Sequence, residues 1–197
     1  PGMLQSVAYN INRSASDLRF FEPGKTYVKN TQDKEKPVTA RFSETNMMSV
    51  IMTGSERPEN WKYKPESTDF FSMKSALEGL FEYLGIRESL VIKTEVPAQF
   101  AFGVTYLLNE KPLAAFGLVS PALCKLSDVD AQMWFAEMNL DLLLKKVRKI
   151  SIRYKDIPKF PAVRRDLALL LDGQVSFEVI QKAAQGAEKK LLKAVDL

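Results

Sequence analysis

The segment STDFFSMKSALEGLFEYLG, residues 67–85, has the pattern of an amphipathic helix with defined ends. Thr68 or Asp69 can accept hydrogen bonds from the free amides of the first turn, and Gly85 supplies a left-handed stop. Between these ends, large apolar residues recur at helical spacing and form one stripe that is typical of core packing. The stripe consists of Met73, Leu77, Leu80, Phe81 and Leu84.

Segments rich in aromatic and β-branched residues lie on both sides of this helix and predict strands. Antiparallel hairpins flanked by a few helices are typical of an α+β architecture. Upstream, we expect a helix to about Arg13, a strand at 18–28 kinked or bulged at Pro23-Gly24, and strands VTARF (38–42) and MMSVIMTG (47–54) that reverse at 44–46. Downstream, we expect strands LVIKTEV (90–96), FAFGVTYLL (100–108), PLAAFGLV (112–119) and MWFAEMN (133–139), then a helix DLLLKKVRK (141–149).

After a junction at Pro158 and Pro161, the remaining residues read as strand, helix and strand: DLALLLD (166–172), a helix from about Ser176 to Glu188, and LLKAVDL (191–197). A lone unit of this size can hardly bury both faces of a sheet, so it reads as cut off. We therefore expect two domains, residues 1–150 and a truncated unit at 151–197.

Composition removes several classes of function. The 197 residues contain no histidine and one cysteine, Cys124, so they exclude His-dependent nucleophile systems, nearly all transition-metal sites and an internal disulfide. There is no GxxxxGK[ST] or GxGxxG loop to hold a phosphate. Without an 18-residue apolar run or a signal peptide, we expect a cytoplasmic protein.

Positive charge is concentrated in one segment. Residues 145–165 hold nine Lys and Arg against one acidic residue, Asp156, although the whole chain has a net charge of only +4. Such a block is typical of binding to a polyanion or to an acidic partner surface. Its first four cations could instead complement the C-terminal dipole of the helix they end. The block consists of Lys145, Lys146, Arg148, Lys149, Arg153, Lys155, Lys159, Arg164 and Arg165.

Other side chains offer little chemistry. Glu95 and Glu137 lie in strand-like segments and could form an acid/base pair, but strand carboxylates are far more often solvated or ion-paired. Cys124 has no histidine or metal-like neighbour in sequence, which favours an inert apolar residue. We expect no catalytic residue and no metal site.

The segment KFPAVRRDLALLLD (159–172) closely resembles the opening of the ferredoxin-like anticodon-binding domain of the bacterial phenylalanyl-tRNA synthetase β subunit. Other segments resemble, in the same order, the class II synthetase-like domain of that subunit, so the resemblance covers essentially the whole chain. It implies a C-terminal portion of the subunit: a non-catalytic class II-like antiparallel sheet flanked by helices, then the start of a ferredoxin-like domain. These segments are PGML and YNINR near the start, DLRFFEPGKTY (17–27), DFFSMKSALEGLFEYLG (69–85), GLVSPALCKL (117–126) and WFAEMNLDLLL (134–144).

The resemblance also implies what this domain lacks. PGKTYVKN resembles the second-motif strand of class II synthetases, but Val28 stands where catalytic relatives have an arginine. WFAEMNLDLLL resembles the third motif without its glycines or arginine. Because ATP phosphates need fixed positive charge, the domain should not catalyse adenylate formation. Ser120-Pro121 replaces a His-Pro found in many relatives, and VPAQFAF lacks their His-Pro-Gly-Arg pattern.

For the whole enzyme the resemblance implies ATP- and magnesium-dependent attachment of phenylalanine to its tRNA by two α and two β subunits. This piece would pack on α subunits, bind no cofactor itself, and contact tRNA. The candidate tRNA-binding residues are Lys155, Lys159, Arg164 and Arg165. The arginines could instead pair with Asp156 or Asp166, and the chain could be a free-standing RNA- or protein-binding module acting through its basic segment. A carboxylate-based hydrolase is the third alternative.

Overall fold

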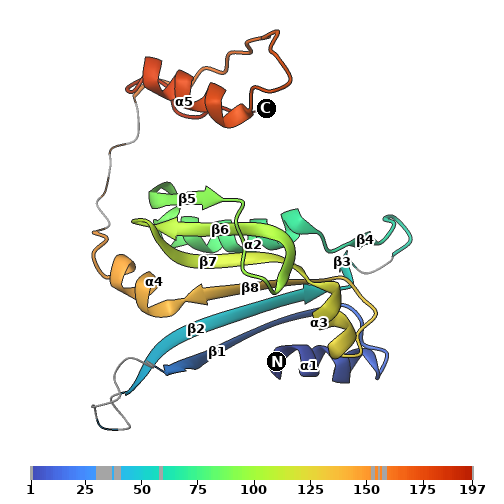
Figure 1. The fold of residues 1–197 in the computed structure, drawn as a ribbon. Coiled ribbons are helices and arrows are strands. Elements are labelled where there is room, and N and C mark those ends of the chain that lie inside the picture. The colour runs from blue at the N-terminus through green and yellow to red at the C-terminus, as the bar shows by residue number, and fades with distance from the viewer. Residues whose placement is uncertain are drawn as a thin grey trace. The chain divides into compact units, whose positions relative to one another are not determined.

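The computed structural model describes residues 2–29, 37, 41–57, 60–151, 154, 156 and 159–196. It divides the chain into two compact units, Pro1–Ile152 and Arg153–Leu197 (Figure 1). The first unit contains α1 (Gly2–Ile11), β1 (Leu18–Lys29), β2 (Phe42–Thr53), β3 (Ser55–Arg57), β4 (Glu66–Ser67), α2 (Phe70–Tyr83), the 3-10 helix η2 (Arg87–Ser89), β5 (Leu90–Lys93), β6 (Phe100–Leu108), β7 (Lys111–Val119), α3 (Pro121–Leu126), β8 (Met133–Asn139) and α4 (Leu140–Val147).

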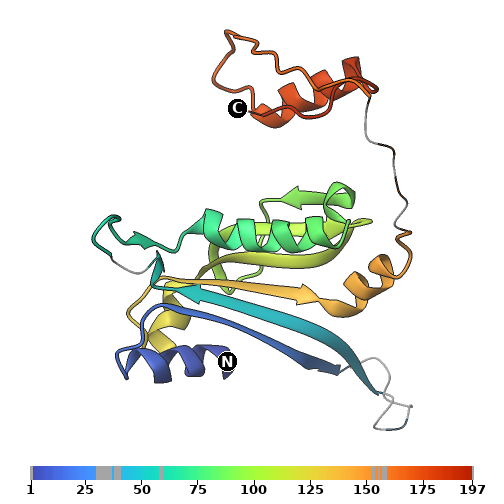
Figure 2. The same ribbon diagram turned by 180° about the vertical axis from the view of Figure 1, so that it is seen from behind.

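The first unit is built on a six-stranded antiparallel sheet in the order β1-β2-β8-β7-β6-β5. Its predicted α+β architecture, an antiparallel sheet with flanking helices, is confirmed. Helix α2 lies along one face of the sheet, as the two opposite views show (Figures 1 and 2). Helices α1 and α3 contribute to a second apolar cluster, which lies on the other face because the strand residues in the two clusters alternate.

The helix that was expected at the centre of the sequence forms as α2. Asp69 is its N-cap: its Oδ1 accepts a hydrogen bond from the Ser72 backbone N–H at 2.8 Å, and Ser72 Oγ accepts one from the Asp69 N–H at 3.2 Å. Gly85 has φ +68°, a conformation that side chains with a Cβ rarely adopt. The apolar stripe is buried beneath the helix against the sheet, with Met73, Leu77 and Phe81 at 0–2% exposure.

The hairpin β1–β2 differs from the prediction in two places. The predicted kink at Pro23-Gly24 is wrong, because β1 pairs with β2 in one continuous register from Leu18↔Thr53 to Lys29↔Phe42. An edge strand tolerates proline because half of its amides face away from the sheet. The predicted reversal at 44–46 is also wrong: β2 runs through these residues, and residues 38–40 of the predicted first strand lie outside the described residues.

Specific polar partners hold β2 straight through 44–46. The Glu44 carboxylate accepts a hydrogen bond from Lys25 Nζ at 2.9 Å, so it joins the two strands of the hairpin. The Asp141 carboxylate accepts two hydrogen bonds from Asn46, one from its backbone N–H at 2.9 Å and one from Nδ2 at 2.7 Å. These residues look like turn formers in sequence, but tertiary contacts keep them in a strand.

Downstream, the strands at 100–108 and 133–139 form as predicted, and β5 is shorter than the predicted 90–96. Asn109 and Glu110 both have positive φ (49° and 65°), the conformation that a two-residue hairpin turn between β6 and β7 requires. Helix α3 and the short strands β3 and β4 were not predicted. All three are six residues or fewer, too short for a periodic pattern to show.

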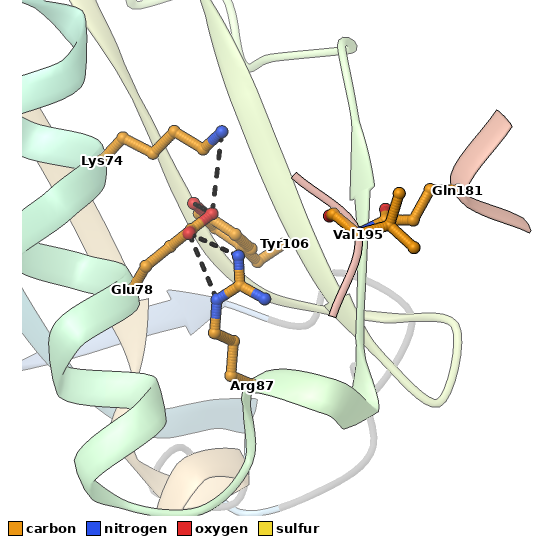
Figure 3. A network of polar contacts seen from close by, with 6 residues as sticks. All are labelled: Lys74, Glu78, Arg87, Tyr106, Gln181 and Val195. Atoms are coloured by element: carbon orange, nitrogen blue, oxygen red, sulfur yellow. Dashed lines mark hydrogen bonds and ion pairs between the residues drawn. The ribbon is translucent and has the colours of Figure 1, made fainter. Parts of the chain in front are cut away.

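A polar network joins α2 to η2 and β6 (Figure 3). The half-buried Glu78 carboxylate accepts hydrogen bonds from Arg87 Nη2 at 2.7 Å and Nε at 3.2 Å, and from Tyr106 Oη at 3.2 Å. Lys74 Nζ lies 3.8 Å from Oε1 of the same group. Burial, with the Glu78 charge as a second cause, raises the pKa of Tyr106, so its hydroxyl stays protonated and donates.

We expect Glu78→Gln to lower the free energy of unfolding of the first unit by about 1–2 kcal/mol, because charge-assisted hydrogen bonds to Arg87 and Tyr106 are weakened in a half-buried site. Glu82→Gln, one turn further along α2, removes the same charge from an exposed position and should change stability by less than about 0.5 kcal/mol. Urea unfolding followed by circular dichroism measures both. Equal effects would show that the network does not stabilise the fold.

The second unit contains α5 (Phe177–Ala187), close to the helix predicted at 176–188. Gln181 Nε2 donates a hydrogen bond to the Val195 carbonyl at 3.5 Å, which joins α5 to the final described segment (Figure 3). The predicted strands at 166–172 and 191–197 are wrong for the described residues, 166–172 and 191–196, which have no strand pairing. A strand needs a neighbour for its amides and carbonyls, and hydrophobic residues such as Leu167 and Leu170 stay exposed here.

Candidate functional site

One face of the sheet in the first unit is only partly covered by helices. Residues of β2 alternate across the sheet: Val50 and Met52 pack into the cluster beneath α2, whereas Ile51 packs into the cluster on the α1 side. On this second side, residues further from α1, such as Glu22 and Ser49, are exposed or half-buried. We call this second side the open face.

A row of residues crosses the open face, one from each strand, because each is the register partner of the next. We call it the cross-strand row. Its side chains share one face because every direct antiparallel pair points to the same side of a sheet. The row consists of Glu22, Ser49, Glu137, Ala115, Thr105 and Lys93.

The polar groups of the row are held by local partners. Glu137 Oε2 accepts a hydrogen bond from Gln99 Nε2 at 3.0 Å. The buried Thr105 hydroxyl donates to the backbone carbonyl of Glu95 at 2.5 Å. The suggested acid/base pair of Glu95 and Glu137 is thus not formed in the described structure. Glu95 contacts Thr105 through its main-chain carbonyl, and the Glu137 carboxylate accepts its hydrogen bond from Gln99.

Electrostatically, the open face is poor in fixed positive charge. The cross-strand row carries two carboxylates and one ammonium, that of Lys93 on the edge strand β5. Val28 lies on the same face as Glu22, six residues further along β1, and its side chain is 59% exposed. A phosphate chain lying across the row would meet two carboxylates that repel it and one cation, Lys93, at the edge of the sheet. Val28, elsewhere on the same face, cannot donate a hydrogen bond.

The β8–α4 connection likewise presents no cation to this face. Met133, Phe135, Glu137 and Asn139 are the β8 residues that alternate onto the open face. Asn139 Oδ1 accepts a hydrogen bond from the Leu142 backbone N–H at 2.9 Å, which caps α4. Sequence reasoning placed Glu137 in a strand but did not place Glu22, Ser49 and Thr105 in the same row. Alternation could assign each one to a face, whereas only the strand register brings them into one row.

The structure keeps the described tRNA-binding candidates at the surface of the second unit. Lys159, Arg164 and Arg165 are exposed, and Lys155 lies outside the described residues. Arg164 Nε lies 3.6 Å from Asp166 Oδ1, with both side chains more than 80% exposed. A pair this exposed contributes little to stability, so it leaves the arginine available to another anion.

Cys124 is half-buried, and burial raises the pKa of its thiol, which makes it a poor nucleophile. No cluster of three or more carboxylate or cysteine side chains is placed to hold a metal ion in the described part of the chain. Over the same residues, no helix has the length and apolar character needed to cross a membrane.

Comparison with known proteins identifies close relatives. A family model described as "Phenylalanyl tRNA synthetase beta chain CLM domain" matches residues 1–140. The phenylalanine–tRNA ligase β subunit of Bacteroides thetaiotaomicron is 39% identical over 200 residues, and that of Bacillus subtilis 32% identical over 197. These alignments cover 100% and 99% of the chain and 24% of each relative. The chain thus spans about a quarter of the length of the relatives it matches.

Among solved structures, the fold is similar to the crystal structure of pyrrolysyl-tRNA synthetase from Desulfitobacterium hafniense. The TM-score is 0.52 at 18% sequence identity, over 75% of this chain and 48% of that one. At this identity the likeness concerns the fold alone. It places the antiparallel sheet and its flanking helices among synthetase-like structures.

Proposed function

The chain belongs to the phenylalanyl-tRNA synthetase β chain family, and from this we propose that it is a non-catalytic part of a phenylalanine–tRNA ligase. In this proposal the whole enzyme attaches phenylalanine to its tRNA with ATP and magnesium in the cytoplasm. The first unit packs on α subunits in an assembly of two α and two β subunits. The second unit contacts tRNA.

The first unit is proposed to be a class II synthetase-like domain without the catalytic chemistry. The sheet order β1-β2-β8-β7-β6-β5 and the likeness to a tRNA synthetase structure support this fold assignment. The observation that carries the functional proposal is the composition of the open face, where Glu22 and Glu137 lie in the cross-strand row and Val28 occupies the same side of β1. Adenylate formation needs cations to neutralise the leaving pyrophosphate. We assign that role to the α subunit.

Packing on an α subunit is supported by exposed aromatic side chains on the β1–β2 hairpin. Phe21, Tyr27 and Phe42 are 73%, 60% and 44% exposed. The register of the hairpin puts all three on the same side, opposite to the open face. Aromatic residues grouped on one surface are typical of protein interfaces. We therefore propose this surface of the hairpin as a contact to the α subunit.

Residues 151–197 are proposed to be the first part of a ferredoxin-like anticodon-binding domain. The strong resemblance of 159–172 to that domain supports the proposal, and so do the helix α5 and the exposed leucines that precede it. We expect the unpaired segment 166–172 to become a strand when further strands of the same domain pair with it. Lys155, Lys159, Arg164 and Arg165 are proposed to contact tRNA phosphates through charge-assisted hydrogen bonds.

We expect the purified 197-residue chain to give no ATP–pyrophosphate exchange with phenylalanine above a protein-free blank, and to co-purify with a phenylalanyl-tRNA synthetase α subunit. The physical reason is that the cross-strand row carries two carboxylates and a single cation, Lys93, which is too little positive charge to neutralise a triphosphate. The matched control is the α–β ligase at the same concentration, which should exchange. Exchange by the chain alone would contradict the non-catalytic assignment, and failure to co-purify with α would contradict the packing role.

A further inference from the structure

The C-terminal end of α4 carries four cations within five residues. Three of them are exposed and the fourth, Lys146, is half-buried. Lys145 and Lys146 belong to the last turn of α4, Arg148 is its C-cap, and Lys149 lies in the turn that follows. We call this surface the basic α4 end. It consists of Lys145, Lys146, Arg148 and Lys149.

This end is held by a rigid frame. At the other end of α4, Asn139 caps the first turn through the Leu142 amide, and Asp141 accepts two hydrogen bonds from Asn46 of β2. In the middle of the helix, Leu143 is buried at 5% exposure in the cluster beneath α2. The four cations therefore lie on a fixed helix or directly beside its end, which lowers the ordering cost of binding an extended anion.

The fold does not use these cations internally. Among the described residues, none of the four side chains takes part in a hydrogen bond or an ion pair. Three of the last four carbonyls of α4 accept hydrogen bonds from main-chain amides, those of Arg148, Lys149 and Ile150, at 2.9–3.0 Å. Asp141, the acidic residue of α4, is turned to Asn46, not to Lys145 one turn away. Side-chain capping of the helix thus does not explain the cluster, although the helix dipole still favours it.

We propose that the basic α4 end binds the phosphate backbone of RNA and so forms a second tRNA contact in the first unit. This inference rests on the proposed function, because a tRNA ligase supplies the polyanion. Four lysine and arginine side chains on one helix end match an array of phosphates, which attracts them irrespective of base sequence. The surface is separate in sequence from the candidates Lys159, Arg164 and Arg165 of the second unit.

The test uses the ligase assembled from this β subunit and its α subunit. In the variant, all four residues of the basic α4 end are replaced by glutamine. The control replaces Lys62, Lys64, Lys111 and Lys125, four exposed cations elsewhere in the first unit, by glutamine, so both proteins lose the same charge. Filter binding of tRNA for phenylalanine across a salt series is the main measurement, with an unrelated tRNA as a second probe.

We expect the α4 variant to bind both RNAs at least about tenfold more weakly than the control at low salt, with the slope of log K against log salt reduced by about 2–4. Affinity equal to that of the control, at an unchanged slope, would overturn the proposal. Loss of α–β assembly in the α4 variant alone would also overturn it, in favour of an acidic subunit surface as the partner.

Failure of this inference and failure of the proposed function give different results. Unchanged tRNA affinity with normal assembly leaves the packing role intact and removes only the α4 contact. A third protein, with glutamine at Lys159, Arg164 and Arg165, reports on the second unit. If it loses affinity and the α4 variant does not, RNA binding belongs to the second unit alone, and the inference is wrong. Circular dichroism of all three proteins verifies that they fold.

Discussion

Replacing Phe81 by alanine is expected to lower the free energy of unfolding of the first unit by about 3–5 kcal/mol. Phe81 is the last residue of the buried stripe of α2 and has 0% exposure. Its ring packs edge-on against Tyr106 of β6, with 5.2 Å between ring centroids. Alanine would remove the ring and leave a cavity between α2 and the sheet. The surrounding strands can only partly close such a cavity, because main-chain pairing with their neighbours holds them in place.

The control is Tyr83→Ala, two residues further along the same helix. Tyr83 is 88% exposed, so its loss removes an aromatic ring of similar size without opening a cavity. We expect a change of less than about 0.5 kcal/mol. Urea unfolding can be followed by fluorescence of Trp134, which is buried and donates its indole N–H to the Thr68 carbonyl at 3.0 Å. Similar losses in both variants would show that α2 does not anchor the fold through its buried stripe.

Gly54→Ala is expected to destabilise the first unit by at least about 2 kcal/mol. Gly54 follows β2 with φ +80°, where a Cβ is strained. An added Cβ would also lie 2.4 Å from both Asp17 Oδ1 and the Ser16 carbonyl oxygen. Relief by moving Asp17 is costly, because its Oδ1 accepts a hydrogen bond from the Ser55 backbone N–H at 2.7 Å. The strain therefore falls on the connection that places α1 and β1 beside β2.

Gly79→Ala is the matched control, and it should change the free energy of unfolding in the opposite direction. Gly79 lies inside α2, and no heavy atom other than the helix's own neighbouring backbone lies within 4 Å of the position of an added Cβ. Alanine there restricts the unfolded chain and favours the helix, so we expect stabilisation of up to about 1 kcal/mol. The same urea titration measures both proteins. If Gly54→Ala left the free energy of unfolding unchanged, the connection around Gly54 would have to rearrange freely to accommodate a Cβ.

Much of the fold could be predicted because its signals are local. The stripe and caps of α2 lie within one segment of sequence, and so do the alternating strands β6 and β8 with the Asn109-Glu110 turn. Hydrophobic periodicity and cap chemistry need no information from the rest of the chain. The family was also recognisable from short segments in order, because their residues are specific in combination.

The errors fall where distant residues decide the local structure. SETN at 43–46 contains residues typical of turns, yet β1 pairs with it over its whole length, and Lys25 and Asp141 bind its side chains. DLALLLD at 166–172 is apolar enough for a strand, yet no described strand lies beside it to pair with its main chain. In both cases the outcome depends on which backbone is adjacent, and propensity does not contain that information.

The sequence by itself determined the α+β class, the central helix, the family and the absence of histidine chemistry, since these follow from residue types and short spacings. Only the tertiary structure decided that Glu22, Ser49, Glu137, Ala115, Thr105 and Lys93 form one row, and that the cations at the end of α4 have no described partner. The physical reason is that strand register and ion pairing are relations between residues far apart in the chain. A one-residue change of register would move every side chain of a strand to the opposite face.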